Sequence, residues 1–112
     1  MYYVYMILCR GGGYYTGLTN DLCRRMRAHA AGKGGHYTHA HPPLALAALW
    51  RCAGETAARR LEYAIKKRLR RPEKEALLAH PAALPFANLS QEDYQHVPGV
   101  TLADCLEGRF HD

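Results

Sequence analysis

The chain has no apolar run near the ~18 residues that a membrane-spanning helix needs. None of its four cysteines belongs to a C-x-x-C pair; they are Cys9, Cys23, Cys52 and Cys105. The chain starts directly on a strand-like pattern, without the charged and apolar regions of a signal peptide. We therefore expect a protein of the cytoplasm with reduced, partly buried thiols.

Acidic residues are scarce in the first part of the chain. Residues 1–80 hold 14 Lys/Arg and 5 Asp/Glu, whereas residues 81–112 hold one Arg and 5 Asp/Glu. A basic body is typical of proteins that bind polyanions, although ordinary solvated surface is the alternative. We expect a basic domain over residues 1–80 and an acidic extension over 81–112 that packs on it or trails from it.

Phenylalanine and tryptophan are also rare, with two and one residues, whereas eight residues are tyrosine. Five of the tyrosines lie in two β-prone runs, 2–9 and 14–18, which flank Gly11-Gly12-Gly13. The glycines permit the positive φ of a tight reversal, so the pattern predicts a β-hairpin. The phenol hydroxyls need partners where they are buried, so they either pack within the sheet or form a polar surface that faces phosphate.

The register of this hairpin decides which tyrosines share a face. Side chains alternate along a strand. Tyr5 and Tyr15 therefore share a face only if the numbers of paired residues sum to an even value, as when Cys9 sits opposite Tyr15. An odd sum without a bulge would place the two rings on opposite faces.

Helix-forming patterns follow the hairpin. The short polar residues of Thr19-Asn20-Asp21 predict the start of a helix that runs from Asp21 to about Ala31. A longer helix is predicted over 57–70, and Pro72 ends it and opens another helix. Thr101 is placed to cap a short helix over 101–106.

The segments between these helices have other patterns. Residues 44–52 are apolar and predict a third strand, with a buried helix as the alternative. Residues 32–43 are rich in Gly and Pro, which predicts a loop. Its His36, His39 and His41 raise the alternative of a zinc site, but no Cys or carboxylate lies near them in sequence. A loop that approaches phosphates fits its donors and its one ring better.

Four motifs occur in a fixed order: a tyrosine on the first strand, Tyr-x-Gly on the second, Arg-x-x-x-His on the first helix and Glu on the second long helix. At these motifs the sequence resembles the GIY-YIG nuclease family, over roughly residues 2–80, and its small stand-alone bacterial members above all. Tyr3-Val4-Tyr5 and Tyr15-Thr16-Gly17 stand where the family has Gly-Ile-Tyr and Tyr-Ile-Gly. Arg25 and His29 match its helix pair, and Glu62 matches its acidic position.

The sequence departs from the family pattern at two places. Tyr3 replaces the glycine of the first motif, which affects backbone packing more than chemistry. Many relatives carry an Asn about twelve to fifteen residues after the Glu, but the window from Lys74 to Leu77 has none. That role is absent or moved, and Asn88 is too distant to assign to it.

The expected fold is α/β (α+β), a three-stranded, mainly antiparallel sheet flanked by helices. The resemblance implies a metal-dependent DNA endonuclease in which Glu62 and water hold Mg²⁺ or Mn²⁺, with no nucleotide cofactor. Arg25 would bind the scissile phosphate with two parallel N–H bonds. Tyr5 would accept a proton from the attacking water, its phenol acidified by nearby Arg and metal charge. Tyr15 and His29 would orient the phosphate and the water.

Further side chains are candidates for nucleic-acid contact, namely Arg24, Arg27, Lys33, His36, Tyr37 and Lys66. Exposed rings on a small basic face suit unstacked bases, so we expect single-stranded DNA rather than branched or duplex DNA. A non-catalytic nucleic-acid-binding module and a nuclease for branched DNA are the alternatives. The oligomeric state and a role in repair or recombination stay open.

Overall fold

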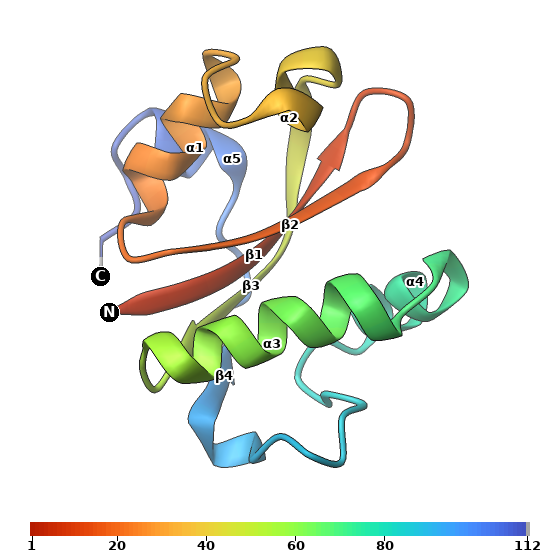
Figure 1. Ribbon diagram of the computed structural model, residues 1–112. Helices are drawn as coiled ribbons and strands as arrows, with labels where there is room; N and C mark the ends of the chain where they lie inside the picture. Colours follow the sequence, from red (N-terminus) through yellow and green to blue (C-terminus); the bar gives the residue numbers. More distant parts are fainter. Residues whose placement is uncertain (112) are drawn as a thin grey trace.

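The computed structural model describes residues 1–111, in which helices cover both faces of one antiparallel sheet (Figure 1). The strands are β1 (Tyr2–Cys9), β2 (Tyr14–Thr19), β3 (Pro43–Cys52) and β4 (Tyr94–His96), in the order β2-β1-β3-β4. The helices are α1 (Leu22–Ala30), α2 (His36–Ala40), α3 (Glu55–Arg68), α4 (Arg71–Ala79) and α5 (Leu102–Leu106), and a 3-10 turn, η1 (Gln91–Asp93), precedes β4. Within residues 1–111 no helix is both long enough and apolar enough to cross a membrane.

The β1 strand is buried on both of its faces. On one face Tyr3, Tyr5 and Ile7 pack into a cluster with residues of α1 and α5. On the other face Val4 and Met6 join a cluster with residues of α3 and α4. This burial on both faces explains why β1 reads as a nearly continuous apolar run in the sequence.

The register between β1 and β2 is the even one. Tyr5 pairs with Gly17 and Ile7 pairs with Tyr15, so the example pairing of Cys9 with Tyr15 is wrong by two residues. Cys9 instead closes the turn, where its backbone N–H donates to the carbonyl of Gly13 over 2.9 Å. Tyr5 and Tyr15 therefore share a face, and their ring centroids lie 6.3 Å apart.

Two predictions of local structure are wrong. The sheet has four strands rather than three, because residues 94–96 pair with the end of β3. A strand of three residues is too short to show an alternating pattern. The segment predicted as a loop over 32–43 contains α2, which begins after Gly35 at a φ of 127°. A helix this short is stabilised by packing rather than by its intrinsic propensity. The predicted strand over 44–52 is confirmed, as β3.

The segment after α4 packs on both sides of the sheet. Leu84 and Phe86 join the cluster under α3, and Cys105 joins the cluster beside α1. The ring of Phe110 meets Tyr3 edge-on at 5.9 Å. Thr101 caps α5 as predicted, by accepting a hydrogen bond from the backbone N–H of Asp104.

The four cysteines are free thiols, as expected. Cys9, Cys52 and Cys105 are buried, and Cys23 is half-buried.

Candidate active site

The Tyr5 hydroxyl is the centre of a buried hydrogen-bond cluster. It lies 2.7 Å from Nε2 of His29, and Nε–H of Arg25 donates to it over 3.3 Å. On the other side of the imidazole, Nδ1 of His29 lies 2.8 Å from Oγ1 of Thr38. Because Arg25 donates to the phenol oxygen, the pattern favours an O–H of Tyr5 that donates to Nε2, with the imidazole proton on Nδ1.

Two glycines let these side chains pack closely. A Cβ on Gly17 would lie 2.4 Å from the Tyr5 hydroxyl oxygen, and one on Gly34 would lie 2.2 Å from Nδ1 of His29. Real Cβ atoms essentially never come within 3.0 Å of such neighbours. Gly17 is also the residue paired with Tyr5 across the sheet. The glycine of the Tyr-x-Gly motif therefore leaves the space that the phenol of Tyr5 occupies.

Burial determines the protonation states of the two rings. Tyr5 and His29 have no exposed surface. Burial outweighs the hydrogen bond from Arg25 and raises the pKa of Tyr5 to about 12. Burial, followed by the charge of Arg25, lowers the pKa of His29 to about 4. Both rings are thus neutral near pH 7, and Arg25 alone does not acidify Tyr5, so the predicted acidification depends on the metal charge.

Arg25 is charged and half-buried beside this pair. Its Nη2 donates to the carbonyl of Gly34 over 3.0 Å, and its bond to Tyr5 raises the pKa of the guanidinium. Arg25 and Arg24 both line an open cleft of ≈ 340 Å³ at the start of α1. The guanidinium is therefore held by neutral acceptors within reach of solvent.

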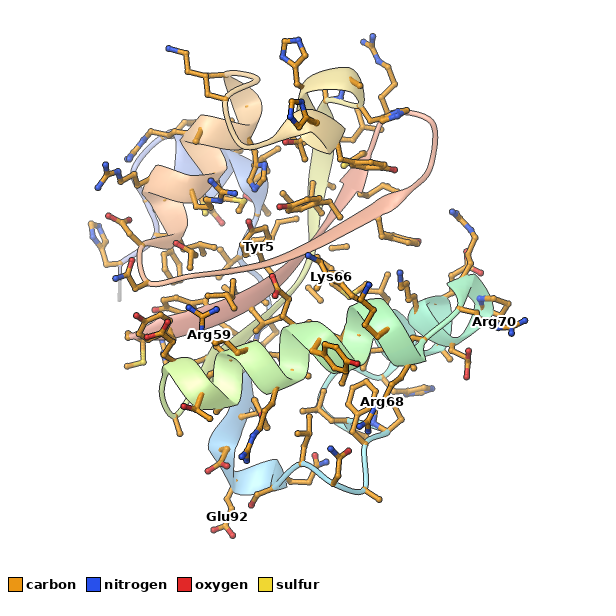
Figure 2. All side chains as sticks on the ribbon, viewed as in Figure 1. Tyr5, Arg59, Lys66, Arg68, Arg70 and Glu92 are labelled. Atoms are coloured by element: carbon orange, nitrogen blue, oxygen red, sulfur yellow. The ribbon has the colours of Figure 1, made fainter. Side chains whose placement is uncertain are left out.

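Glu62 belongs to α3, which covers the face of the sheet opposite to the one that carries Tyr5. Figure 2 shows Lys66 on the edge of α3 that is turned toward Tyr5. The Nζ atom of Lys66 lies 5.7 Å from the ring centroid of Tyr15 and 3.7 Å from Oε2 of Glu62. The negative charge of Glu62 is also one of the causes that raise the pKa of Tyr5. The two layers thus meet around the edge strand β2.

The carboxylate of Glu62 is partly exposed, and its ion-pair partner is Lys66. The Glu62 side chain is 25% exposed, so solvent reaches it. Across residues 1–111, no three His, Cys, Asp or Glu side chains gather closely enough to hold a metal ion, which argues against a zinc site of the loop histidines. A hard cation such as Mg²⁺ keeps most of its waters and needs few protein ligands, so Glu62 and water fit such an ion.

Residues 1–76 match the family model described as the GIY-YIG catalytic domain. The chain belongs to the GIY-YIG family. Its GIY-YIG domain suggests a nuclease that acts on DNA, and nucleases of this family generally depend on a divalent metal.

Similar proteins are small members of the same family. UPF0213 protein BH0048 of Halalkalibacterium halodurans is 42% identical over 90 residues, which are 80% of this chain and 94% of that protein. UPF0213 protein VNG_2274C of Halobacterium salinarum is 44% identical over 77 residues, which are 69% of this chain and 99% of that protein. The alignment with the solution NMR structure of BH0048 covers 70% of this chain and 84% of the BH0048 chain, with a TM-score of 0.47.

Aromatic rings extend from the centre of the GIY-YIG domain toward the hairpin turn. Tyr15 stacks on Tyr37 at 6.2 Å between centroids, and Tyr37 lies 4.6 Å from the ring of His41. Tyr37 is 38% exposed, so the row ends at the surface. Lys33 and His36, which flank this row in sequence, are exposed. Arg27 instead lies toward α5, where its charge acts on Cys105.

Sequence reasoning missed two groups of the GIY-YIG site. The hydroxyl of Thr38 is hydrogen-bonded to Nδ1 of His29, and the Gly34 carbonyl accepts a hydrogen bond from Arg25. Both belong to the segment over 32–43, whose composition indicates only a loop. Thr38 lies between two glycines and a proline, where no periodic pattern assigns a side chain to a site. Its contact with His29 is therefore seen only in the three-dimensional structure.

Proposed function

We propose that this GIY-YIG domain is a metal-dependent DNA endonuclease that hydrolyses phosphodiester bonds and prefers single strands. The observation that carries this proposal is the Tyr5 hydroxyl, which is shared between a charged Arg25 and a neutral His29. A tyrosine with only a packing role needs one partner, whereas this one lies between a proton acceptor and a phosphate-binding cation.

Tyr5 serves as the general base with His29 behind it. The Tyr5 oxygen takes a proton from the attacking water, and its own proton moves to Nε2 of His29, 2.7 Å away. This exchange avoids a full phenolate, which burial disfavours. Burial and the charge of Arg25 also disfavour a protonated His29, and the movement of Arg25 to the phosphate would remove the second of these two causes. Because His29 has no exposed surface, it positions Tyr5 and receives a proton, in place of the role that the resemblance implies, which is to orient the phosphate and the water.

Arg25 covers the base until substrate binds. Its guanidinium now donates to the Tyr5 hydroxyl and to the Gly34 carbonyl, both of which are neutral acceptors. A phosphate oxygen carries charge and accepts two parallel N–H bonds, so it competes well for the same donors. We infer that Arg25 moves to the scissile phosphate and uncovers the Tyr5 oxygen for water.

Glu62 would hold Mg²⁺ or Mn²⁺ together with water, and the bound ion would stabilise negative charge on the phosphate. Lys66 lies over the ring of Tyr15, whose centroid is 5.0 Å from that of His29, so Tyr15 would line the path of the strand. The exposed ring of Tyr37 offers a surface for an unstacked base, which supports the preference for single strands.

The test uses labelled oligonucleotides of one sequence in single-stranded, duplex and forked form, with Mg²⁺, Mn²⁺ or EDTA. We expect metal-dependent cleavage that is fastest on the single strand. Arg25→Ala should slow it by about 10²-fold or more, since one preorganised donor is worth that much. A wild-type protein that binds but never cuts would be a binding module, and faster cleavage of the fork would assign it to branched DNA.

A further inference from the structure

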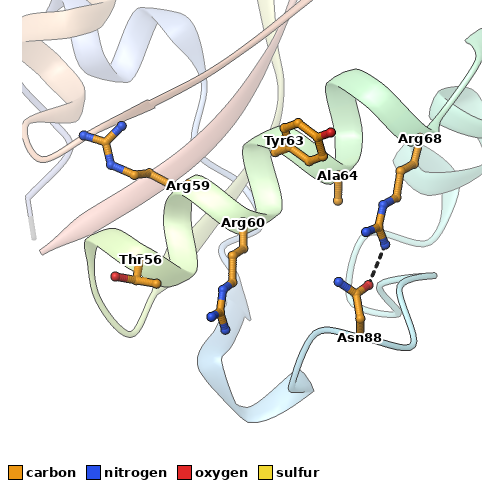
Figure 3. A pocket seen from close by; sticks show the side chains of 7 residues that line it. All are labelled: Thr56, Arg59, Arg60, Tyr63, Ala64, Arg68 and Asn88. Carbon is orange, nitrogen blue, oxygen red and sulfur yellow. Dashed lines mark hydrogen bonds between the residues drawn. The ribbon is translucent and has the colours of Figure 1, made fainter.

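A second basic cleft lies on the side of α3 that is turned away from Glu62. It has a volume of ≈ 580 Å³ and lies between α3 and the segment that contains Asn88 (Figure 3). With 3.6 residues per helical turn, Arg60 projects about 160° around α3 from Glu62. Figure 3 shows Arg60 and Arg68 on this side and Arg59 on the other side of the helix axis.

The cleft carries positive charge that the protein does not neutralise. Arg59, Arg60 and Arg68 are among its lining residues, and none of the described residues that line it is acidic. Arg59 is paired with Glu55. Arg60 and Arg68 form no ion pair with any carboxylate in residues 1–111. Exposed like charges without counter-charges create a positive potential that attracts an anion.

Arg68 also orients a further donor. Its Nη1–H donates to Oδ1 of Asn88 over 2.7 Å. This bond fixes the amide so that its nitrogen is on the side toward Arg60 (Figure 3). The cleft therefore presents two guanidinium groups and one amide N–H₂, all of which donate, and phosphate oxygens are the acceptors that match them.

Tyr63 lies between this cleft and the candidate active site. It follows Glu62 directly on α3, lines the cleft and is 58% exposed. A path of about 160° around a helix that is about 10–12 Å wide is about 14–17 Å long, which a strand with 3.4 Å per nucleotide covers in about four to five nucleotides. A strand that leaves Glu62 would pass over the exposed Tyr63 ring, on which a base can stack.

We propose that the α3 cleft binds a backbone phosphate of the substrate strand, about four to five nucleotides from the bond that is cut. Arg60, Arg68 and Asn88 are its donors, and Tyr63 supports the intervening bases. The inference rests on the proposed nuclease function and adds a second point of attachment. Asn88 lies beyond residue 76, where the match to the GIY-YIG catalytic domain ends, so the segment after α4 takes part in binding the substrate.

The test compares the full chain with the double variant Arg60→Ala/Arg68→Ala. The matched control is Arg70→Ala/Lys74→Ala, which removes the same charge from the start of α4. Binding of a fluorescent 12-nucleotide single strand is measured in EDTA over a range of salt concentrations. We expect the first variant to bind about tenfold more weakly at 0.1 M salt, with a slope of log Kd against log salt that is smaller by about 1.4. The control should stay within about twofold of wild type.

A second readout separates binding from folding and from chemistry. Hydrolysis of bis(4-nitrophenyl) phosphate, which is too small to reach the α3 cleft, should be unchanged in the Arg60/Arg68 variant. The inference would be overturned if the Arg60/Arg68 variant bound the strand as tightly as the control does. It would also be overturned if this variant lost small-ester hydrolysis to the same extent as strand binding. A wild-type protein that hydrolyses nothing contradicts the proposed function, whereas the binding data in EDTA still decide whether the cleft holds a strand.

Discussion

Replacing Tyr5 by Phe removes one hydroxyl, so the buried His29 and the half-buried Arg25 both lose a hydrogen-bond partner. Nε2 of His29 loses its bond at 2.7 Å and Nε of Arg25 loses its bond at 3.3 Å. A buried polar group without a partner costs about 1–3 kcal/mol, so Tyr5→Phe should lower the free energy of unfolding by about 2 kcal/mol. If the hydroxyl is the general base, cleavage should fall by about 10²–10⁴-fold, far more than this loss of stability explains.

Tyr94→Phe is the matched control for Tyr5→Phe. The Tyr94 hydroxyl donates to the Ala57 carbonyl over 2.7 Å, and burial raises the pKa of Tyr94 to about 12 as well. Urea unfolding followed by Trp50 fluorescence should show a loss of about 1 kcal/mol for the control, while gel-based cleavage assays should show unchanged activity. A Tyr5→Phe variant that cuts within threefold of wild type would refute the role of Tyr5, and so would an equal loss of activity in the control.

Three other perturbations address the packing of the site, its titration and the segment after α4. Gly17→Ala would force a Cβ to within 2.4 Å of the Tyr5 hydroxyl and should reduce cleavage at least tenfold, whereas Gly54→Ala, with open space around it and extended backbone, should not. As the pH falls from 6.5 to about 4, the free energy of unfolding should fall by up to about 3 kcal/mol, because His29 binds a proton in the unfolded chain but stays neutral in the folded protein. In a pH series of urea melts, His29→Gln should reduce this dependence on pH. Deleting residues 81–112 removes parts of both hydrophobic clusters and should abolish the cooperative transition in circular dichroism; a cooperative melt would instead show that residues 1–80 fold alone.

The sequence predicts the elements that have strong local patterns. The β1–β2 hairpin follows from two β-prone runs around three glycines, and α1 follows from the cap at Asp21. The strand β4 and the helix α2 have only three and five residues, too few to show a period. Their formation depends on partners that are distant in sequence, such as the end of β3 for β4.

The sequence predicts which side chains of the candidate site lie close together better than it predicts their pKa values. The motif order predicts that Tyr5, Arg25 and His29 come together, and in the structure Arg25 and His29 are both hydrogen-bonded to the Tyr5 hydroxyl. Burial raises the pKa of Tyr5 although Arg25 lowers it, and the sequence does not show how completely this ring is buried; acidification by metal charge stays a prediction. Asn88 shows the same limit, since its contact with Arg68 joins two segments that share no sequence pattern.

Glu62 gives the most direct test of the central claim, which is metal-dependent cleavage at the Tyr5 centre. The measurement is the rate of single-strand cleavage against Mg²⁺ concentration for wild type and Glu62→Gln, with binding of the same strand measured in EDTA. The account predicts a saturable dependence on Mg²⁺ in wild type, and no cleavage at any Mg²⁺ concentration by a variant that still binds the strand. Cleavage by Glu62→Gln at the wild-type rate, or wild-type cleavage in EDTA, would contradict it.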